Sequence, residues 1–275
     1  MATAQHDVML IKYCSVAALA LIVWDHLILL GEEKTIILRS GARFSVPAWV
    51  FCVNRYWSII GMIHINVVLV FLSASEMSNG RCQSLSAMIV LYLIIATFGT
   101  NTYLTIRQFQ VWEGGRSILY MLITSFVLTH IPGLVLAVLS MKNLYANSTY
   151  VPALNTCAVL TKSKLYGAWT CVVVYNTIAL VLSLLNGLHR PRHRNVDIIS
   201  YLKSDGALFF GIVFVLRYAV LILMIKLPTD QFFLPTLFVW PVTSATLSRF
   251  IITSEARKIR RDVYVLGSYE METRQ

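Results

Sequence analysis

The stretch SILYMLITSFVLTHIPGLVLAVLS at residues 117–140 contains no Asp, Glu, Lys or Arg and lies between Arg116 and Lys142. A helix needs roughly 20 mostly apolar residues to cross a bilayer core, so this stretch predicts a transmembrane helix. Six further stretches are similarly long and mostly apolar, and none alternates with the period of two that a membrane β-barrel requires. The seven predicted spans are 9–30, 48–72, 84–106, 117–140, 166–188, 207–227 and 232–252.

The composition of the whole chain agrees with this pattern. Of its 275 residues, 57% are hydrophobic and only 13% are charged, with a mean hydropathy of +0.68. A soluble domain carries about 25% charged residues, and so few charges cannot cover so much apolar surface in water. We therefore expect one all-α transmembrane domain of seven helices over residues 1–275, in which residues 253–275 form a short polar tail.

The basic residues predict the orientation of the chain in the membrane. With the N-terminus outside, most of the 23 Lys and Arg residues fall in cytoplasmic segments, namely 31–47, 107–116, 189–206 and the C-terminal tail. This distribution follows the positive-inside rule. It also accounts for the net charge of +10, so we expect the lipid bilayer as a partner and no nucleic acid.

Two features of the predicted outside segments agree with this orientation. Asn147 begins the sequon Asn147-Ser148-Thr149, which is glycosylated only on the lumenal side. Cys82 and Cys157 both lie in outside segments, where an oxidising compartment permits a disulfide between them. The alternative is two unpaired thiols.

A seven-helix chain with its N-terminus outside resembles a receptor of the G-protein-coupled type in layout, although the usual sequence signatures of spans three and seven are missing. A closer resemblance is local. The stretch WDHLILLGEE at residues 24–33, followed by VNRY at residues 53–56, resembles the opening of basidiomycete seven-span proteins defined by an N-terminal domain of unknown function (domain of unknown function 6533). Arg107 and the sequence Ser248-Arg249-Phe250 match further features of those proteins. The resemblance implies an integral membrane protein without an assigned activity, and it supplies no ligand.

Three charged residues are predicted to lie well inside spans, where charge is costly and is usually retained for a reason. Asp25 in span one and Arg55 in span two lie at matching depth, so we expect an ion pair between them. That pair is either a static structural contact or a latch that changes between states.

Arg217 lies near the middle of span six, and the spans hold no acid at its depth. We expect it to anchor a central polar cavity that binds an anionic ligand, and the alternative is that it snorkels along its own helix. Polar residues at middle depth supply the remaining predicted ligand contacts. They are His64, Asn66, Asn101, His130 and Asn176.

The basic residues Arg190, Arg192 and Arg194 follow span five on the predicted cytoplasmic side. They are interpreted either as a topology determinant in contact with anionic lipid or as a docking surface for a cytosolic partner.

No catalytic motif is found, and we expect no enzyme activity, cofactor or metal. Span seven has no Lys for a retinal Schiff base, and spans five to seven hold no His or Asp for a zinc hydrolase. The sequence therefore predicts a receptor-like sensor of a small or lipidic ligand, in the plasma membrane or another membrane of the secretory pathway. The alternative is a transporter or lipid-handling protein that uses a cavity around Arg217.

Overall fold

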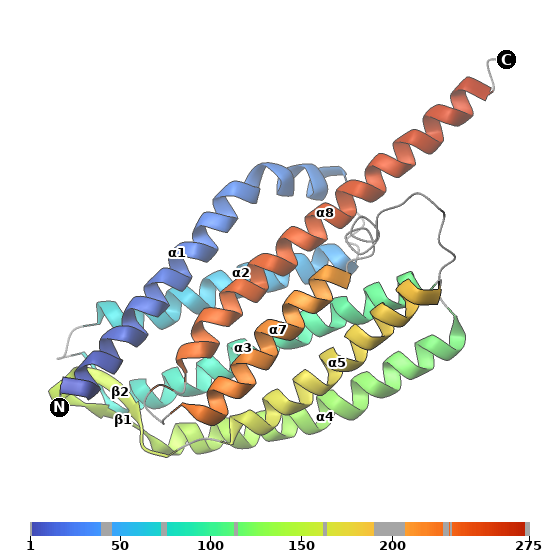
Figure 1. Ribbon diagram of the computed structural model, residues 1–275. Helices are drawn as coiled ribbons and strands as arrows, with labels where there is room; N and C mark the ends of the chain where they lie inside the picture. The colour runs from blue at the N-terminus through green and yellow to red at the C-terminus, as the bar shows by residue number, and fades with distance from the viewer. Residues whose placement is uncertain are drawn as a thin grey trace.

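The computed structural model describes residues 2–39, 46–72, 76–112, 115–161, 164–189, 207–227, 231 and 233–272. Within these ranges seven long helices run up and down beside one another, with the N-terminus at one end of the bundle and the C-terminus beyond the other (Figure 1). They are α1 (Ala2–Arg39), α2 (Val46–Asn66), α3 (Asn79–Val111), α4 (Arg116–Asn147), α5 (Leu165–His189), α7 (Ala207–Lys226) and α8 (Leu234–Glu272). A π-helical segment, Val67–Phe71, continues α2.

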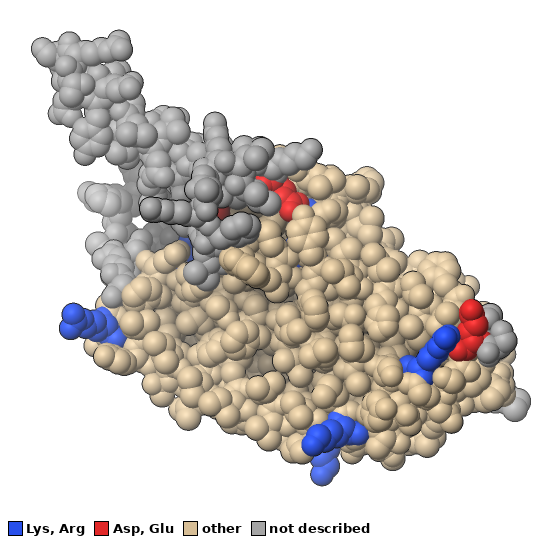
Figure 2. Space-filling model, turned by 180° about the vertical axis from the view of Figure 1, so that it is seen from behind, with Lys and Arg blue, Asp and Glu red and all other residues tan. Residues whose placement is uncertain are grey.

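Six of these helices, all except α8, are long and apolar enough to cross a membrane. The described charged residues visible in Figure 2 lie toward the two ends of the molecule, and a broad uncharged surface separates them. Such a surface is suited to contact with lipid, because a soluble protein of this size would not leave so large an apolar area exposed to water. The predicted multi-pass, all-α membrane protein is thereby confirmed.

The lower hydropathy of α8 has a structural reason. Most of its residues between Pro235 and Ile252 are buried against other helices. Polar side chains such as Thr236, Ser244 and Ser248 therefore face protein neighbours, so this helix does not need the apolar surface of a lipid-facing span.

A two-stranded antiparallel hairpin covers the N-terminal end of the bundle (Figure 1). Its strands are β1 (Ser148–Val151) and β2 (Thr156–Val159), joined through Asn155, which adopts a left-handed conformation with φ 44°. Asn tolerates this region better than most residues do. Cys157 on β2 forms a disulfide with Cys82 at the start of α3, which confirms the predicted bridge.

The helices pack closely where α2 meets α3 and α8. A Cβ atom added at Gly61 would lie 2.5 Å from the ring of Trp240 and 3.0 Å from the ring of Tyr92. Those two rings stack with centroids 5.9 Å apart. Only glycine fits at this point, as is common where membrane helices approach closely.

Candidate functional site

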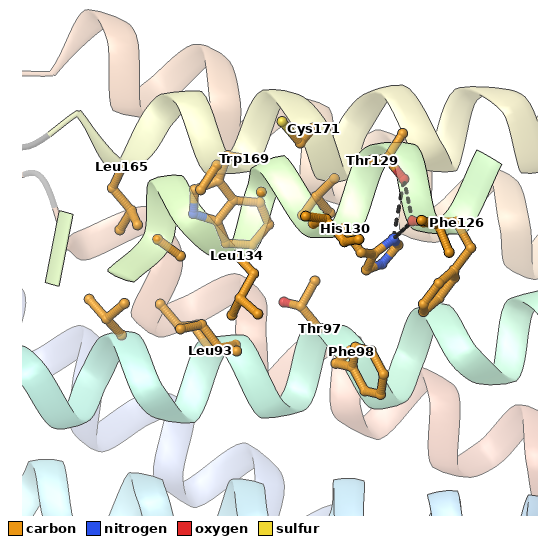
Figure 3. Close-up of a pocket in the computed structure, with 18 residues that line it drawn as sticks. Leu93, Thr97, Phe98, Phe126, Thr129, His130, Leu134, Leu165, Trp169 and Cys171 are labelled. Carbon is orange, nitrogen blue, oxygen red and sulfur yellow. Dashed lines mark hydrogen bonds between the residues drawn. The ribbon is translucent and has the colours of Figure 1, made fainter. Parts of the chain in front are cut away.

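A cavity of about 220 Å³ lies between α3, α4 and α5 (Figure 3). Its walls are almost wholly apolar, and Thr97, Thr129 and His130 are the main polar side chains among the lining residues. Four large lining residues are also exposed at the surface of the bundle, namely Phe98 (54%), Val127 (43%), Ile131 (59%) and Leu134 (50%). The cavity is therefore open sideways between α3 and α4.

His130 projects from α4 into one end of this cavity, next to Phe98 and Phe126 (Figure 3). Its ring stacks on Phe126 at 3.8 Å between centroids and meets the ring of Tyr175 edge-on at 4.9 Å. These aromatic contacts hold the imidazole in one orientation.

The hydrogen bonds of His130 define its protonation state. The guanidinium of Arg217 only donates, so its bond to Asn101 turns the Asn101 Oδ1 atom toward α7. That leaves the amide nitrogen of Asn101 to donate to His130 Nε2 at 2.8 Å. Nε2 must then be the acceptor, and Nδ1 carries the proton and donates to the carbonyl of Phe126 at 2.9 Å. His130 is neutral, and both of its ring nitrogens are engaged.

Arg217 lies at the end of this chain of hydrogen bonds, on the side of Asn101 away from His130. Its side chain is 3% exposed, so it does not snorkel to the surface. It makes no ion pair with any residue that the structure describes, and it does not line the cavity. Asn101 supplies the hydrogen bond that offsets part of the cost of burying the charge. Of the predicted ligand contacts, the structure thus brings together Arg217, Asn101 and His130.

The other three predicted contacts lie elsewhere. His64 on α2 is 3.4 Å from the hydroxyl of Tyr92, and Asn66 donates to the carbonyl of Ser15 at 3.2 Å. Both residues connect neighbouring helices on the far side of α3. Asn176 on α5 donates at 2.7 Å to a carbonyl of its own helix, and its Oδ1 has no hydrogen-bond partner within the described chain.

Sequence reasoning missed the polar face of α3 that organises this region. Thr97, Asn101 and Thr105 are spaced by four residues, which places them on one face of a helix. Thr97 lines the cavity, Asn101 binds Arg217, and Thr105 is hydrogen-bonded to Tyr175. The spacing was a readable signal, but a Thr in an apolar span usually bonds its own backbone and carries little information.

A second polar network joins α1, α2 and α8 near the end opposite the hairpin. Arg55 donates through Nε to His26 Nδ1 at 2.8 Å, and its Nε lies 3.4 Å from Glu33 Oε2. The hydroxyl of Tyr56 donates to the same carboxylate at 2.8 Å. Asn54, one residue earlier, donates to Ser244 Oγ of α8 at 2.9 Å.

The predicted pairing of Asp25 with Arg55 was wrong. Asp25 accepts a hydrogen bond from Arg249 of α8 at 2.6 Å, whereas Arg55 donates to His26 and pairs with Glu33. Depth along the membrane normal placed Asp25 and Arg55 at one level, but α8 also packs along α1 and brings Arg249 to the acid.

The pairing of Asp25 with Arg249 can be tested by a double-mutant cycle. Asp25→Asn combined with Arg249→Gln should show a coupling energy of about 1 kcal/mol, because Asp25 is buried but Arg249 is 57% exposed. The free energy of unfolding is measured by SDS titration in mixed micelles. The matched cycle of Asp25→Asn with Arg55→Gln should give the smaller coupling, and the reverse order would refute this assignment.

The fold and these contacts define an α-helical, multi-pass membrane protein with a cavity between three helices. Residues 13–60 match the model of a family of unknown function, DUF6533. This match agrees with the predicted resemblance over that segment. No curated protein matches the chain. The matched segment contains the α1 and α2 residues that meet in the second polar network, namely His26, Glu33, Arg55 and Tyr56.

Two further predictions concern the ends of the bundle. Asn147 is the last residue of α4, beside the hairpin, and its amide donates to the carbonyl of Asn143 at 2.8 Å. Its glycosylation stays a prediction. The basic run of Arg190, Arg192 and Arg194 lies outside the described residues.

Proposed function

We propose that this chain is a receptor-like sensor of a small or lipidic ligand, with seven spanning helices, its N-terminus outside and its C-terminus in the cytoplasm. The termini at opposite ends of the bundle support an odd number of crossings. The disulfide and the sequon at the hairpin end support placing that end outside, where bridges form and glycans are added.

The observation that carries this proposal is the position of α3. Thr97 of α3 lines the cavity, and the following turns of the same helix bind three other helices on the way to the opposite end. Asn101 binds Arg217 of α7, the hydroxyl of Tyr103 lies 3.1 Å from Ser254 Oγ of α8, and Gln108 donates to Ala179 of α5 at 2.6 Å. A ligand that shifts α3 or α4 at the cavity would therefore bias contacts of α5, α7 and α8 at the cytoplasmic end.

The transporter alternative depended on a central cavity around Arg217. Arg217 is buried against Asn101 and does not line the cavity described above, so this cavity does not support the transporter alternative.

The sensor proposal predicts a response at the cytoplasmic end when the cavity fills. Oleyl alcohol added to the purified chain in phosphatidylcholine nanodiscs should change amide hydrogen exchange of residues 104–111 by about twofold or more. Tyr103→Phe, which removes the hydroxyl bonded to Ser254, should reduce that change without weakening binding of the alcohol. The exposed Tyr120→Phe serves as the matched control. An alcohol that binds in the cavity but leaves exchange at residues 104–111 unchanged would overturn the sensor.

A further inference from the structure

The two ends of the cavity are closed. Toward the hairpin, Val159 of β2 packs against the buried cluster that contains Leu165 and Trp169, both of which line the cavity. The hairpin is held in place by the Cys82–Cys157 disulfide and by the bond from the Tyr150 amide to Asn79 Oδ1 at 2.8 Å. The hairpin therefore lies between this end of the cavity and the aqueous phase on that side of the bundle.

The opposite end of the cavity is closed by aromatic rings. Phe126 stacks on His130, and Phe98 meets both rings edge-on, with centroids 5.6 Å from Phe126 and 6.2 Å from His130. The remaining opening lies between α3 and α4, where Phe98, Ile131 and Leu134 are exposed on the uncharged surface of the bundle. In a membrane that opening faces acyl chains.

The interior has a distinct chemistry. No Asp, Glu, Lys or Arg is among the lining residues. His130 has both nitrogens engaged, and the hydroxyl of Thr129 donates to the carbonyl of Ser125 at 2.8 Å. Within the described chain, the hydroxyl of Thr97 and the indole N–H of Trp169 make no hydrogen bond. Figure 3 shows the hydroxyl of Thr97 directed into the cavity.

We infer that the cavity takes a neutral amphiphile dissolved in the bilayer, an apolar chain with one acceptor oxygen, which enters sideways between α3 and α4. The inference rests on the proposed ligand site and names its ligand class. Phe98 and Leu134 border the opening, and Thr97 and Trp169 donate to the oxygen of the ligand. A charged headgroup is disfavoured inside, because it would be buried without a counter-charge. At about 220 Å³, below the roughly 300–1,000 Å³ of common ligand pockets, the cavity fits one narrow chain.

Quenching of Trp169 fluorescence by bromine tests this inference in phosphatidylcholine nanodiscs. Dibrominated stearyl alcohol should give a saturable component of quenching, and that component should be absent in Trp169→Phe. Exposed Trp residues such as Trp24 (66%) contribute only a non-saturable background from alcohol dissolved in the bilayer. Thr97→Val should weaken binding of the alcohol about fivefold and leave binding of dibrominated octadecane, which has no oxygen, unchanged. Thr170→Val, an exposed position on the same helix as Trp169, is the matched control.

Charge and access are tested with the same signal. Dibrominated stearyl sulfate should bind about tenfold more weakly than the alcohol or worse. Leu134→Phe should slow association of the alcohol about threefold or more by narrowing the opening. Leu128→Phe is the control, since Leu128 lies on the same helix, is 67% exposed and does not line the cavity.

The outcomes separate the two proposals. Absence of saturable Trp169 quenching by both the alcohol and the octadecane would refute the ligand site and with it the sensor. If the alcohol binds but the sulfate binds equally well, or Leu134→Phe leaves the association rate unchanged, the neutral, sideways-entering ligand is wrong while the site stands.

Discussion

Replacing Arg55 with Ala is expected to lower the free energy of unfolding by about 3–5 kcal/mol, because it removes one partner of a buried ion pair. The side chains of Arg55 and Glu33 are 3% and 5% exposed. Without the guanidinium, the carboxylate of Glu33 stays buried with the hydroxyl of Tyr56 as its described hydrogen-bond partner. The substitution also removes two hydrogen bonds to His26 and the contact of the guanidinium over the ring of Phe51, 5.3 Å from its centroid.

The measurement is SDS titration of the purified chain in mixed micelles. Arg55→Lys keeps the charge but loses the planar fork, so it should fall between wild type and Arg55→Ala and remain measurable if the latter fails to fold. Arg55→Met with Glu33→Gln should recover part of the loss, since no uncompensated charge remains. The exposed Arg81→Ala is the control; a cost for Arg55→Ala no greater than that of Arg81→Ala would contradict the structural role.

Removing the disulfide with Cys157→Ser should lower the free energy of unfolding by about 2–4 kcal/mol, because the bond closes a loop with a sequence separation of 75 residues. The bond also holds the hairpin against the end of α3, where Ser148 Oγ lies 2.6 Å from Ser86 Oγ. Loss of the cross-link enlarges the unfolded ensemble and frees the hairpin at the same time.

Thermal unfolding in detergent, with and without a reductant, measures this effect. Reduction should lower the melting temperature of the wild type to that of Cys157→Ser and leave that variant unchanged. Cys171→Ser, which removes a free cysteine, should respond to the reductant as the wild type does. A wild-type melting temperature that is insensitive to full reduction would rule out this contribution.

Several elements were predictable because they depend on local composition. The apolar length of stretches such as 117–140 is enough to require a helix in lipid, since backbone groups there must bond within the segment. The Cys82–Cys157 bridge followed from the predicted topology, which placed both residues on one side of the membrane. The resemblance in residues 24–33 and 53–56 covers the α1 and α2 residues of the second polar network.

The candidate site was predictable only in part. Arg217, Asn101 and His130 are predictable because polar groups at membrane depth are expensive, and these three residues meet in the structure. His64 and Asn66 met the same criterion but serve other helix contacts. Trp169 and Phe126 carry no such signal, because aromatic residues in apolar spans are ordinary core or lipid-facing residues until their neighbours are known.

The sequence by itself determined the class of this protein and its apolar helices, because the cost of leaving backbone and charge in lipid acts on each segment separately. It predicted the bridge but left two unpaired thiols as the alternative. The tertiary structure alone decided which partners meet. Because α8 packs along α1, Asp25 pairs with Arg249, and Arg55 pairs with Glu33. The arrangement of α3, α4 and α5 places the cavity next to His130 and away from Arg217. Depth in the membrane is one coordinate, whereas a contact between two side chains also requires the order and rotation of the helices that carry them.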